Sequence, residues 1–141
     1  MKNILVLIDG SAPSLRALEQ AFELAQQKGP VTLHVVNVQI PITPSRAARF
    51  FSQEVLDDYY SEEGQQALEK AASLLEQSPA PIKKQVVVGR LEEAVPEYID
   101  THQCTHVVMG TRGLSALPGM VLGSVTSKII QAVDVPITLV K

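Results

Sequence analysis

Three glycines and a serine in the last third of the chain have the spacing of a site that binds phosphate. The spacing is Gly110-x2-Gly113-x9-Gly123-Ser124, with an apolar run before it and a helical pattern after it. The free N–H groups at the start of a helix, together with the positive end of the helix dipole, bind anions. Gly110 and Gly113 carry no Cβ, so a phosphate or a sugar could approach the loop backbone closely.

Two hydroxyl groups strengthen this interpretation without settling it. Ser124 and Thr126 could donate hydrogen bonds to phosphate oxygens. Glycine-rich loops also close ordinary turns, and Ser124 could be only the N-cap of the helix, so the spacing alone leaves both interpretations open. Two better-known phosphate motifs are absent from the sequence, namely Gly-x4-Gly-Lys followed by Ser or Thr, and Gly-x-Gly-x-x-Gly after the first strand.

An aspartate follows the first apolar run of the chain. Residues 4–8 are apolar without alternation, which is typical of a strand buried on both faces of a parallel sheet, and Asp9 comes directly after them. At the carboxyl edge of such a sheet a carboxylate can accept a hydrogen bond from a ribose hydroxyl or an amino group. Asp9 or Ser11 could instead cap the helix that follows.

Strands and helices alternate along the whole sequence. Apolar patterning predicts strands over residues 4–8, 31–38, 82–89, 105–109 and 135–140, and helices over residues 14–28, 52–77, 91–102 and 124–133. We expect a weak point at Gly64 in the second helix, and no regular structure over residues 39–51, which include Pro41 and Pro44. The alternation predicts a single-domain, doubly wound α/β fold, a five-stranded parallel sheet with helices on both faces.

Composition and charge exclude several classes of function. The chain has 141 residues, 45% of them hydrophobic, and a net charge of −3 with scattered basic residues, which argues against a nucleic-acid partner. No apolar stretch approaches the ~20 residues that span a membrane, and the first apolar run is too short for a signal sequence, so we expect a cytoplasmic protein. His34 and the single Cys104 are expected to be packing residues, and the acidic residues of the 52–77 helix a solvated face rather than a metal site.

The glycine signature, followed by Val125 and Thr126, resembles the ATP-binding signature of the universal stress protein family. Residues 4–11, 33–36 and 135–140 agree with it, so the resemblance covers essentially residues 1–141 as one nucleotide-binding domain. It implies strand order 3-2-1-4-5, in which strands 1 and 4 lie side by side and their connections leave in opposite directions. Such a switch point is the usual nucleotide site of an open α/β sheet.

The resemblance also implies which residues meet the nucleotide. Adenosine would contact Asp9 and the backbone of Leu7 and Ile8, and the adenine edge would contact the main chain of Val35. Met109 and Gly110 would line the ribose side, and Arg112 and Gly113 would form the start of the phosphate loop. The phosphates would be bound by Gly123, Ser124, Val125 and Thr126. The role of Arg112 is inferred from its charge alone. Pro118-Gly119 departs from relatives, which often place basic residues in this loop. Fewer cations could mean weaker binding of ATP, a preference for AMP or ADP, or greater dependence on Mg²⁺.

Together these residues predict an ATP-binding stress-response protein in which ATP, or ADP or AMP, sets conformation or assembly and hydrolysis is slow or absent. The loop offers Ser, Thr and one Arg, where phosphoryl-transfer enzymes use Lys, Mg²⁺-binding carboxylates and a residue that orients the nucleophile. A slow ATPase or an autophosphorylating protein therefore remains an open alternative, and a metal site is not indicated. The protein partner that would read the nucleotide state is unknown.

A different class of function is an interaction module that does not need a nucleotide. Residues 136–140 form a short apolar strand that could pair antiparallel with its symmetry mate and make a homodimer. A phospho-accepting receiver domain, which shares this kind of sheet, fits poorly. Its accepting aspartate should follow the third strand, where this chain has Val88-Gly89-Arg90.

Overall fold

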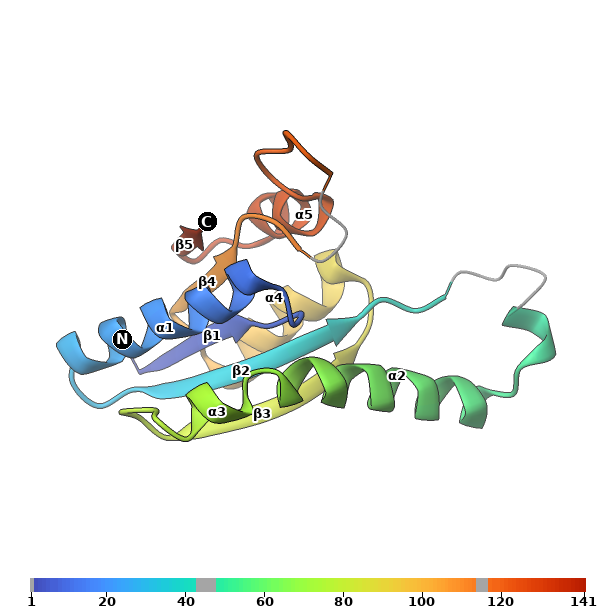
Figure 1. Cartoon of the computed structure of the whole chain (residues 1–141), viewed down its shortest axis with the longest axis horizontal. Helices are drawn as coiled ribbons and strands as arrows, with labels where there is room; N and C mark the ends of the chain where they lie inside the picture. Colours follow the sequence, from blue (N-terminus) through green and yellow to red (C-terminus); the bar gives the residue numbers. More distant parts are fainter. Residues whose placement is uncertain (1, 43–47, 114–116) are drawn as a thin grey trace.

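Five parallel strands form the single sheet of the computed structural model, which describes residues 2–42, 48–113 and 117–141 (Figure 1). The order is β3-β2-β1-β4-β5, so both the predicted fold class and the strand order are confirmed. The strands are β1 (Asn3–Leu7), β2 (Thr32–Gln39), β3 (Ile82–Val88), β4 (His106–Gly110) and β5 (Ile137–Val140). Because β1 pairs with β2 on one side and β4 on the other, it is the centre of the sheet.

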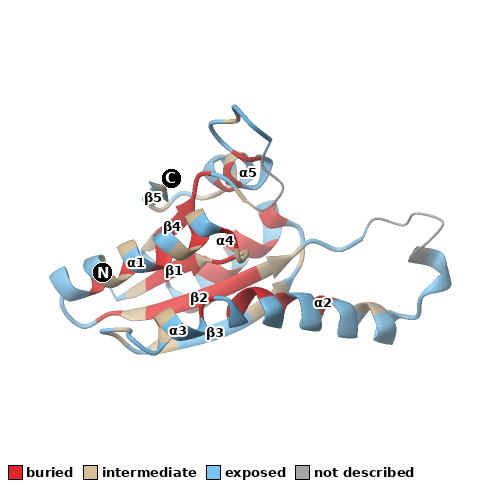
Figure 2. Cartoon of the chain, in the orientation of Figure 1, coloured by how far each residue is buried: buried red, intermediate tan, exposed pale blue. Residues whose placement is uncertain are grey.

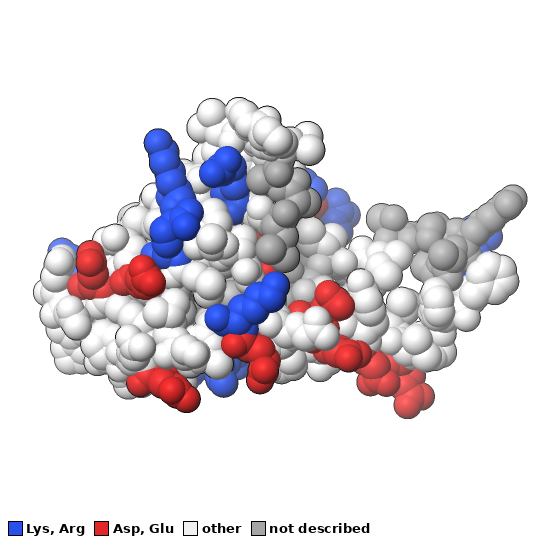
Figure 3. All heavy atoms as spheres, viewed as in Figure 1, with Lys and Arg blue, Asp and Glu red and all other residues white. Residues whose placement is uncertain are grey.

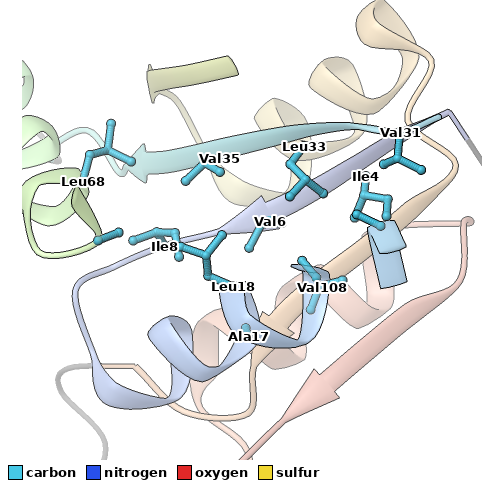
Figure 4. Packing of buried hydrophobic residues seen from close by; sticks show 13 residues of the cluster. Ile4, Val6, Ile8, Ala17, Leu18, Val31, Leu33, Val35, Leu68 and Val108 are labelled. Atoms are coloured by element: carbon cyan, nitrogen blue, oxygen red, sulfur yellow. The ribbon is translucent and has the colours of Figure 1, made fainter. Parts of the chain in front are cut away.

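Helices cover both faces of this sheet. One face is covered by α1 (Ala12–Gln27), α2 (Gln53–Glu69) and the short α3 (Ala72–Leu75), and the other by α4 (Leu91–His102) and α5 (Ser124–Ala132). Ile4 and Val6 of β1, and Ile8 directly after it, pack toward α1 (Figure 4), while Leu5 packs toward α4. The alternation of side chains along a strand thus divides one continuous apolar run between two cores.

Burial is concentrated in the central strands (Figure 2). Ile4, Leu5 and Val6 have no exposed surface, as do Val107 and Val108 of the neighbouring β4. The edge strand β3 is different, because Lys83 and Lys84 are exposed there. A central strand with apolar residues on both faces and an edge strand with lysines is the distribution that keeps a parallel sheet covered and its edge unattractive to other strands.

The second predicted helix differs from the sequence expectation. It is divided into α2 and α3 near Ala71, whose N–H donates to the carbonyl of Leu68 in a tighter turn, and it runs without a break through Gly64. Gly64 is buried where α2 crosses β3, and a Cβ there would overlap the side chain of Val86. Gly64 is therefore a point of close packing, and the prediction of a weak point there was wrong.

The connection between β2 and α2 contains one turn of 3-10 helix, η1 (Ala48–Phe50), in a region predicted to be irregular. Residues 43–47, including Pro44, lie outside the described residues. The first turns of α2 extend past the carboxyl end of β2, and the acidic side chains of this helix are exposed (Figures 1 and 3). None of the described helices is both long enough and apolar enough to cross a membrane.

A buried histidine, His34, lies near the amino end of β2, at the edge of the sheet opposite to the carboxyl ends of the strands. His34 is 1% exposed, with Nδ1 2.8 Å from the hydroxyl of Tyr98 and Nε2 3.0 Å from Oδ1 of Asn3. We assign the neutral ring in which the Tyr98 hydroxyl donates to Nδ1 and Nε2–H donates to Asn3. Burial, reinforced by the positive charges of His102 and Lys83, lowers the pKa of His34 to about 4. The histidine is a packing residue, as predicted.

This histidine makes stability depend on pH. Because the pKa of His34 is lower in the folded protein than its ordinary 6.5, its contribution to stability is complete above pH 6.5 and is lost as the pH falls toward 4. The loss approaches about 3 kcal/mol once the ring is protonated in both states. We expect the free energy of unfolding to fall less steeply between pH 6.5 and 4 for His34→Gln than for the wild type, as measured by urea denaturation followed by circular dichroism.

Groups that are not coupled to His34, including His106, whose pKa is also lowered by burial, are present in both proteins and cancel in the comparison. Parallel pH profiles for the two proteins would contradict the assignment of a neutral buried ring.

Candidate functional site

A cavity opens at the carboxyl edge of β1, β2 and β4, where the connections after β1 and β4 diverge. Its empty space, with the open mouth included, is about 560 Å³. Its lining is formed by Leu7, Ile8, Asp9, Ser14, Val36, Asn37, Val38, Ile40, Leu91, Met109, Gly110, Arg112, Gly113, Val125 and Thr126.

Most of the residues predicted for the site meet in this cavity. Those in the lining are Leu7, Ile8, Asp9, Met109, Gly110, Arg112, Gly113, Val125 and Thr126. Gly123 and Ser124 do not line it but begin the helix that closes its far end. Val35 is fully buried on the other face of the sheet, in the core beneath α1 and α2 (Figure 4).

The sequence reasoning missed Ser14, Val36, Asn37, Val38, Ile40 and Leu91. Val36 and Val38 could have been found from strand alternation, because Leu7 is opposite Val36 in the register and their side chains share the face of α4. Asn37 could also have been found, because it is a polar residue within a run of β-branched residues. Its side-chain amide donates to the carbonyl of Ile8 at 2.7 Å and so holds the ends of β1 and β2 together.

Two hydrogen bonds fix the loop between β4 and α5. The N–H of Gly123 donates to the carbonyl of Thr111 at 2.8 Å, and the hydroxyl of Thr126 donates to the carbonyl of Gly110 at 3.0 Å. Thr126 is 2% exposed, and its single hydroxyl hydrogen is committed to this bond. The prediction that this hydroxyl donates to a phosphate is therefore not supported by the geometry, and only the backbone N–H of Thr126 is suited to that role.

The first turn of α5 presents backbone N–H groups at the end of the cavity. Gly123 is the N-cap, with φ −73° and ψ 164°, and it makes no side-chain capping bond. Ser124 is the first helical residue, so the alternative in which it caps the helix was wrong. The first intrahelical hydrogen bond runs from Ser127 to Gly123, so the N–H groups of residues 124–126 precede the ladder. Helices bind anions at this position.

Asp9 has one oxygen in a structural role and the other at the loop after β4. Its Oδ1 accepts from the N–H of Ser11 at 2.8 Å, and Ser11 is the N-cap of α1, accepting from the N–H of Ser14. Its Oδ2 would lie 2.6 Å from a Cβ placed on Gly113. Ser11 therefore caps the helix while Asp9 supports the turn, and Oδ2 remains an acceptor placed between the two loops.

The structure explains the three glycines of the signature to different extents. A Cβ on Gly110 would lie 2.8 Å from the Cβ of Pro13 and 3.2 Å from the N of Ser14, so this glycine lets α1 pack against β4. Gly113 permits the close approach of Asp9 described above. Gly123 has an ordinary φ, and its added Cβ would meet nothing nearer than 3.6 Å. The fold itself thus accounts for Gly110 and Gly113 but not for Gly123.

Comparisons with known proteins agree with this architecture. The family model described as "Universal stress protein family" matches residues 1–141. The chain belongs to the universal stress protein family. It is similar to Universal stress protein MJ0531 of Methanocaldococcus jannaschii, at 30% identity over 99% of this chain and 82% of that protein. It is also similar to Universal stress protein YxiE of Bacillus subtilis, at 30% identity over 98% of this chain and 97% of that protein.

Solved structures share the fold at lower identity. Hypothetical protein MJ0577 superposes with a TM-score of 0.82 at 24% identity, covering 99% of this chain and 95% of that one. A universal stress protein crystallised in complex with cAMP has a TM-score of 0.70 at 24% identity, with coverage of 99% and 97%. A family member from Arabidopsis thaliana with AMP bound has a TM-score of 0.64 at 16% identity, with coverage of 100% and 92%. At these identities the likeness establishes the fold alone.

The glycines should separate in their effect on stability. We expect Gly110→Ala to lower the free energy of unfolding by about 1–3 kcal/mol, because its methyl group collides with Pro13 and with the backbone at Ser14. Gly123→Ala, at an ordinary φ and with only ordinary van der Waals contacts for the added methyl group, should change it by less than about 1 kcal/mol. Urea denaturation of both variants measures this difference, and equal losses for the two would refute the distinction.

Proposed function

We propose that this universal stress protein binds an adenine nucleotide in the cavity at the carboxyl edge, and that occupancy regulates its conformation or assembly in the cytoplasm, with slow or no hydrolysis. The observation that carries the proposal is the placement of Asp9 and the N-terminus of α5 at one switch point. An acceptor for ribose and a row of N–H groups for phosphate then share one cavity. The relatives crystallised with cAMP and AMP support the choice of adenine.

The lining suggests how such a ligand would lie. Val36, Val38 and Leu91 provide an apolar wall from β2 and α4, which suits the flat face of a base. The Oδ2 oxygen of Asp9, which lies close to Gly113, suits a ribose hydroxyl. The first turn of α5, beginning at Gly123, suits a phosphate, and the absence of a side chain at Gly123 leaves the space that the fold itself does not require. ATP, ADP and AMP all share these three parts.

A regulatory role is supported by the loop that joins the two ends of the phosphate site. This loop starts at Gly113, ends at Gly123 and carries exposed apolar side chains, with Leu117 66% and Val121 77% exposed. A ligand bound beside Gly113 and Gly123 would therefore lie next to this surface and change what a partner meets there. Such a surface could be read by a protein partner. Within the described residues no cluster of three His, Cys, Asp or Glu side chains could hold a metal ion, so any Mg²⁺ would come with the nucleotide.

Nucleotide binding is tested by isothermal titration calorimetry with AMP, ADP and ATP on protein freed of nucleotide. We expect saturable binding of at least one of them, and a loss of at least about tenfold in affinity for Gly123→Val, because the added side chain occupies the phosphate space. Gln131→Val is the matched control, since residue 131 is exposed near the other end of the same helix. No binding by the wild type at millimolar nucleotide would refute the proposal, as would unchanged affinity in Gly123→Val.

We also propose that the protein forms a homodimer through β5, which ends the sheet beside β4. The carbonyls of Pro136 and Val140 accept from the N–H groups of Val107 and Thr111, at 3.0 and 2.9 Å. Backbone groups alternate along a strand, so those of Ile137 and Leu139 face away from β4. In the described part of the chain only β4 pairs with β5, and a second copy could extend the sheet at this edge.

This alternation gives a sharp test of the dimer. We expect the wild type to sediment as a dimer and Leu139→Pro as a folded monomer, because proline removes an N–H that faces the partner but none that faces β4. Leu139→Ala keeps that N–H and serves as the control that should retain dimers. Wild-type protein that is monomeric at all concentrations would refute the proposal. A dimer that binds no nucleotide would favour the nucleotide-independent interaction module.

A further inference from the structure

We infer that this site selects nucleoside monophosphates, linear or cyclic, over ATP. The inference rests on the proposed function, since it concerns how many phosphates the same cavity can hold. It follows from the charges and hydrogen-bond donors that the chain places beyond the first turn of α5.

The charged side chains in the lining cancel one another. Among the described residues that line the cavity, only Asp9 and Arg112 carry charge, and their charges are opposite. Arg112 is exposed, so water and salt screen its attraction for a phosphate. Asp9 places its Oδ2 close to Gly113, where the loop begins, and repels an anionic tail that enters there. The side chains therefore provide almost no net positive charge for a chain of phosphates.

The backbone at the start of α5 can neutralise only a limited charge. Its dipole is equivalent to roughly half a positive charge at the N-terminus, and its first N–H groups suit the oxygens of one phosphate. Each further phosphate adds negative charge and needs donors of its own. The nearest chain that could supply them is the loop between Gly113 and Gly123.

That loop carries no cation. None of the nine residues from Leu114 to Leu122 carries a charge. The top of the molecule, where residues 117–122 lie, shows no Lys, Arg, Asp or Glu atoms in Figure 3. Pro118 has no N–H, and Gly119 has φ +82° in a tight turn in which the N–H of Met120 donates to the carbonyl of Leu117 at 3.2 Å.

Lys70 is a cation near the edge of the sheet, but it lies on the side away from the cavity. The Nζ of Lys70 is 3.4 Å from the position that a Cβ on Gly10 would occupy. Lys70 ends α2, which covers the face of the sheet opposite to Val36 and Leu91, and it does not line the cavity. It is therefore a matched control for the charge of Arg112.

The test compares AMP, ADP and ATP by calorimetry on nucleotide-free protein in the absence of Mg²⁺. We expect AMP to bind at least about tenfold more tightly than ATP, with ADP between them, because the added phosphates meet no compensating charge. ATP that binds as tightly as AMP, or more tightly, would overturn the inference and leave the proposed function standing. If none of the three binds, the proposed function itself fails.

Variants of the loop decide whether charge is the cause. Val121→Lys adds a cation at an exposed loop position outside the Pro118-Gly119 turn, and we expect it to strengthen ATP binding by about fivefold or more while AMP changes by less than about twofold. Val121→Gln, which adds length and polarity without charge, should leave the ATP to AMP ratio unchanged. Lys70→Met should also leave the ATP to AMP ratio unchanged. An equal gain in ATP binding in Val121→Gln, or a change of the ATP to AMP ratio in Lys70→Met, would contradict the charge argument.

Discussion

The close approach of two loops determines the geometry of the carboxyl edge of this protein. The start of α1 packs against the end of β4 because Gly110 has no Cβ to strike Pro13, and the turn after β1 approaches the loop after β4 because Gly113 has none to strike Asp9. The two connections leave toward opposite faces of the sheet, so their meeting creates a cavity rather than a filled junction. Larger residues at these two positions would push the loops apart, and with them the acceptor at Asp9 and the donors of α5.

Once the loops have met, protein hydrogen bonds hold them without help from a ligand. Thr126 and Gly123 both donate to carbonyls at the end of β4. The N–H of Thr111, directly after β4, donates to the carbonyl of Val140 at the end of β5. The first turn of α5 is therefore fixed relative to the sheet before anything binds. Such preorganisation lowers the ordering cost of binding, and it explains why a hydroxyl near the phosphate end is used by the fold itself.

The sequence predicted the architecture more completely than the side-chain roles. Uninterrupted apolar runs such as residues 4–8 identify buried parallel strands, and glycine at a strand end identifies the edge where loops converge. The roles of Val35 and Val36 depend on the face of the sheet to which each side chain points. This face is set by the register of β2 with β1 rather than by the local sequence pattern. Gly64 illustrates the same limit, since its helix propensity is poor but its position against Val86 decides its role. Ser124 is a residue type that often caps helices, but the geometry of the loop makes the preceding residue, Gly123, the N-cap.

Recognition through backbone N–H groups has a fixed capacity, and this constrains what the fold can bind. The helix that follows Gly123 presents the same backbone donors whatever side chains follow, so under the proposed function a first phosphate site would survive extensive sequence change. Further phosphates depend on the side chains of the loop that begins at Gly113, and those can change without disturbing the sheet. In this chain that loop is apolar and exposed at Leu117 and Val121. The surface that in another sequence could attract a phosphate tail is here better suited to contact an apolar surface, so the same few residues would set both the size of the ligand and the kind of partner that detects it.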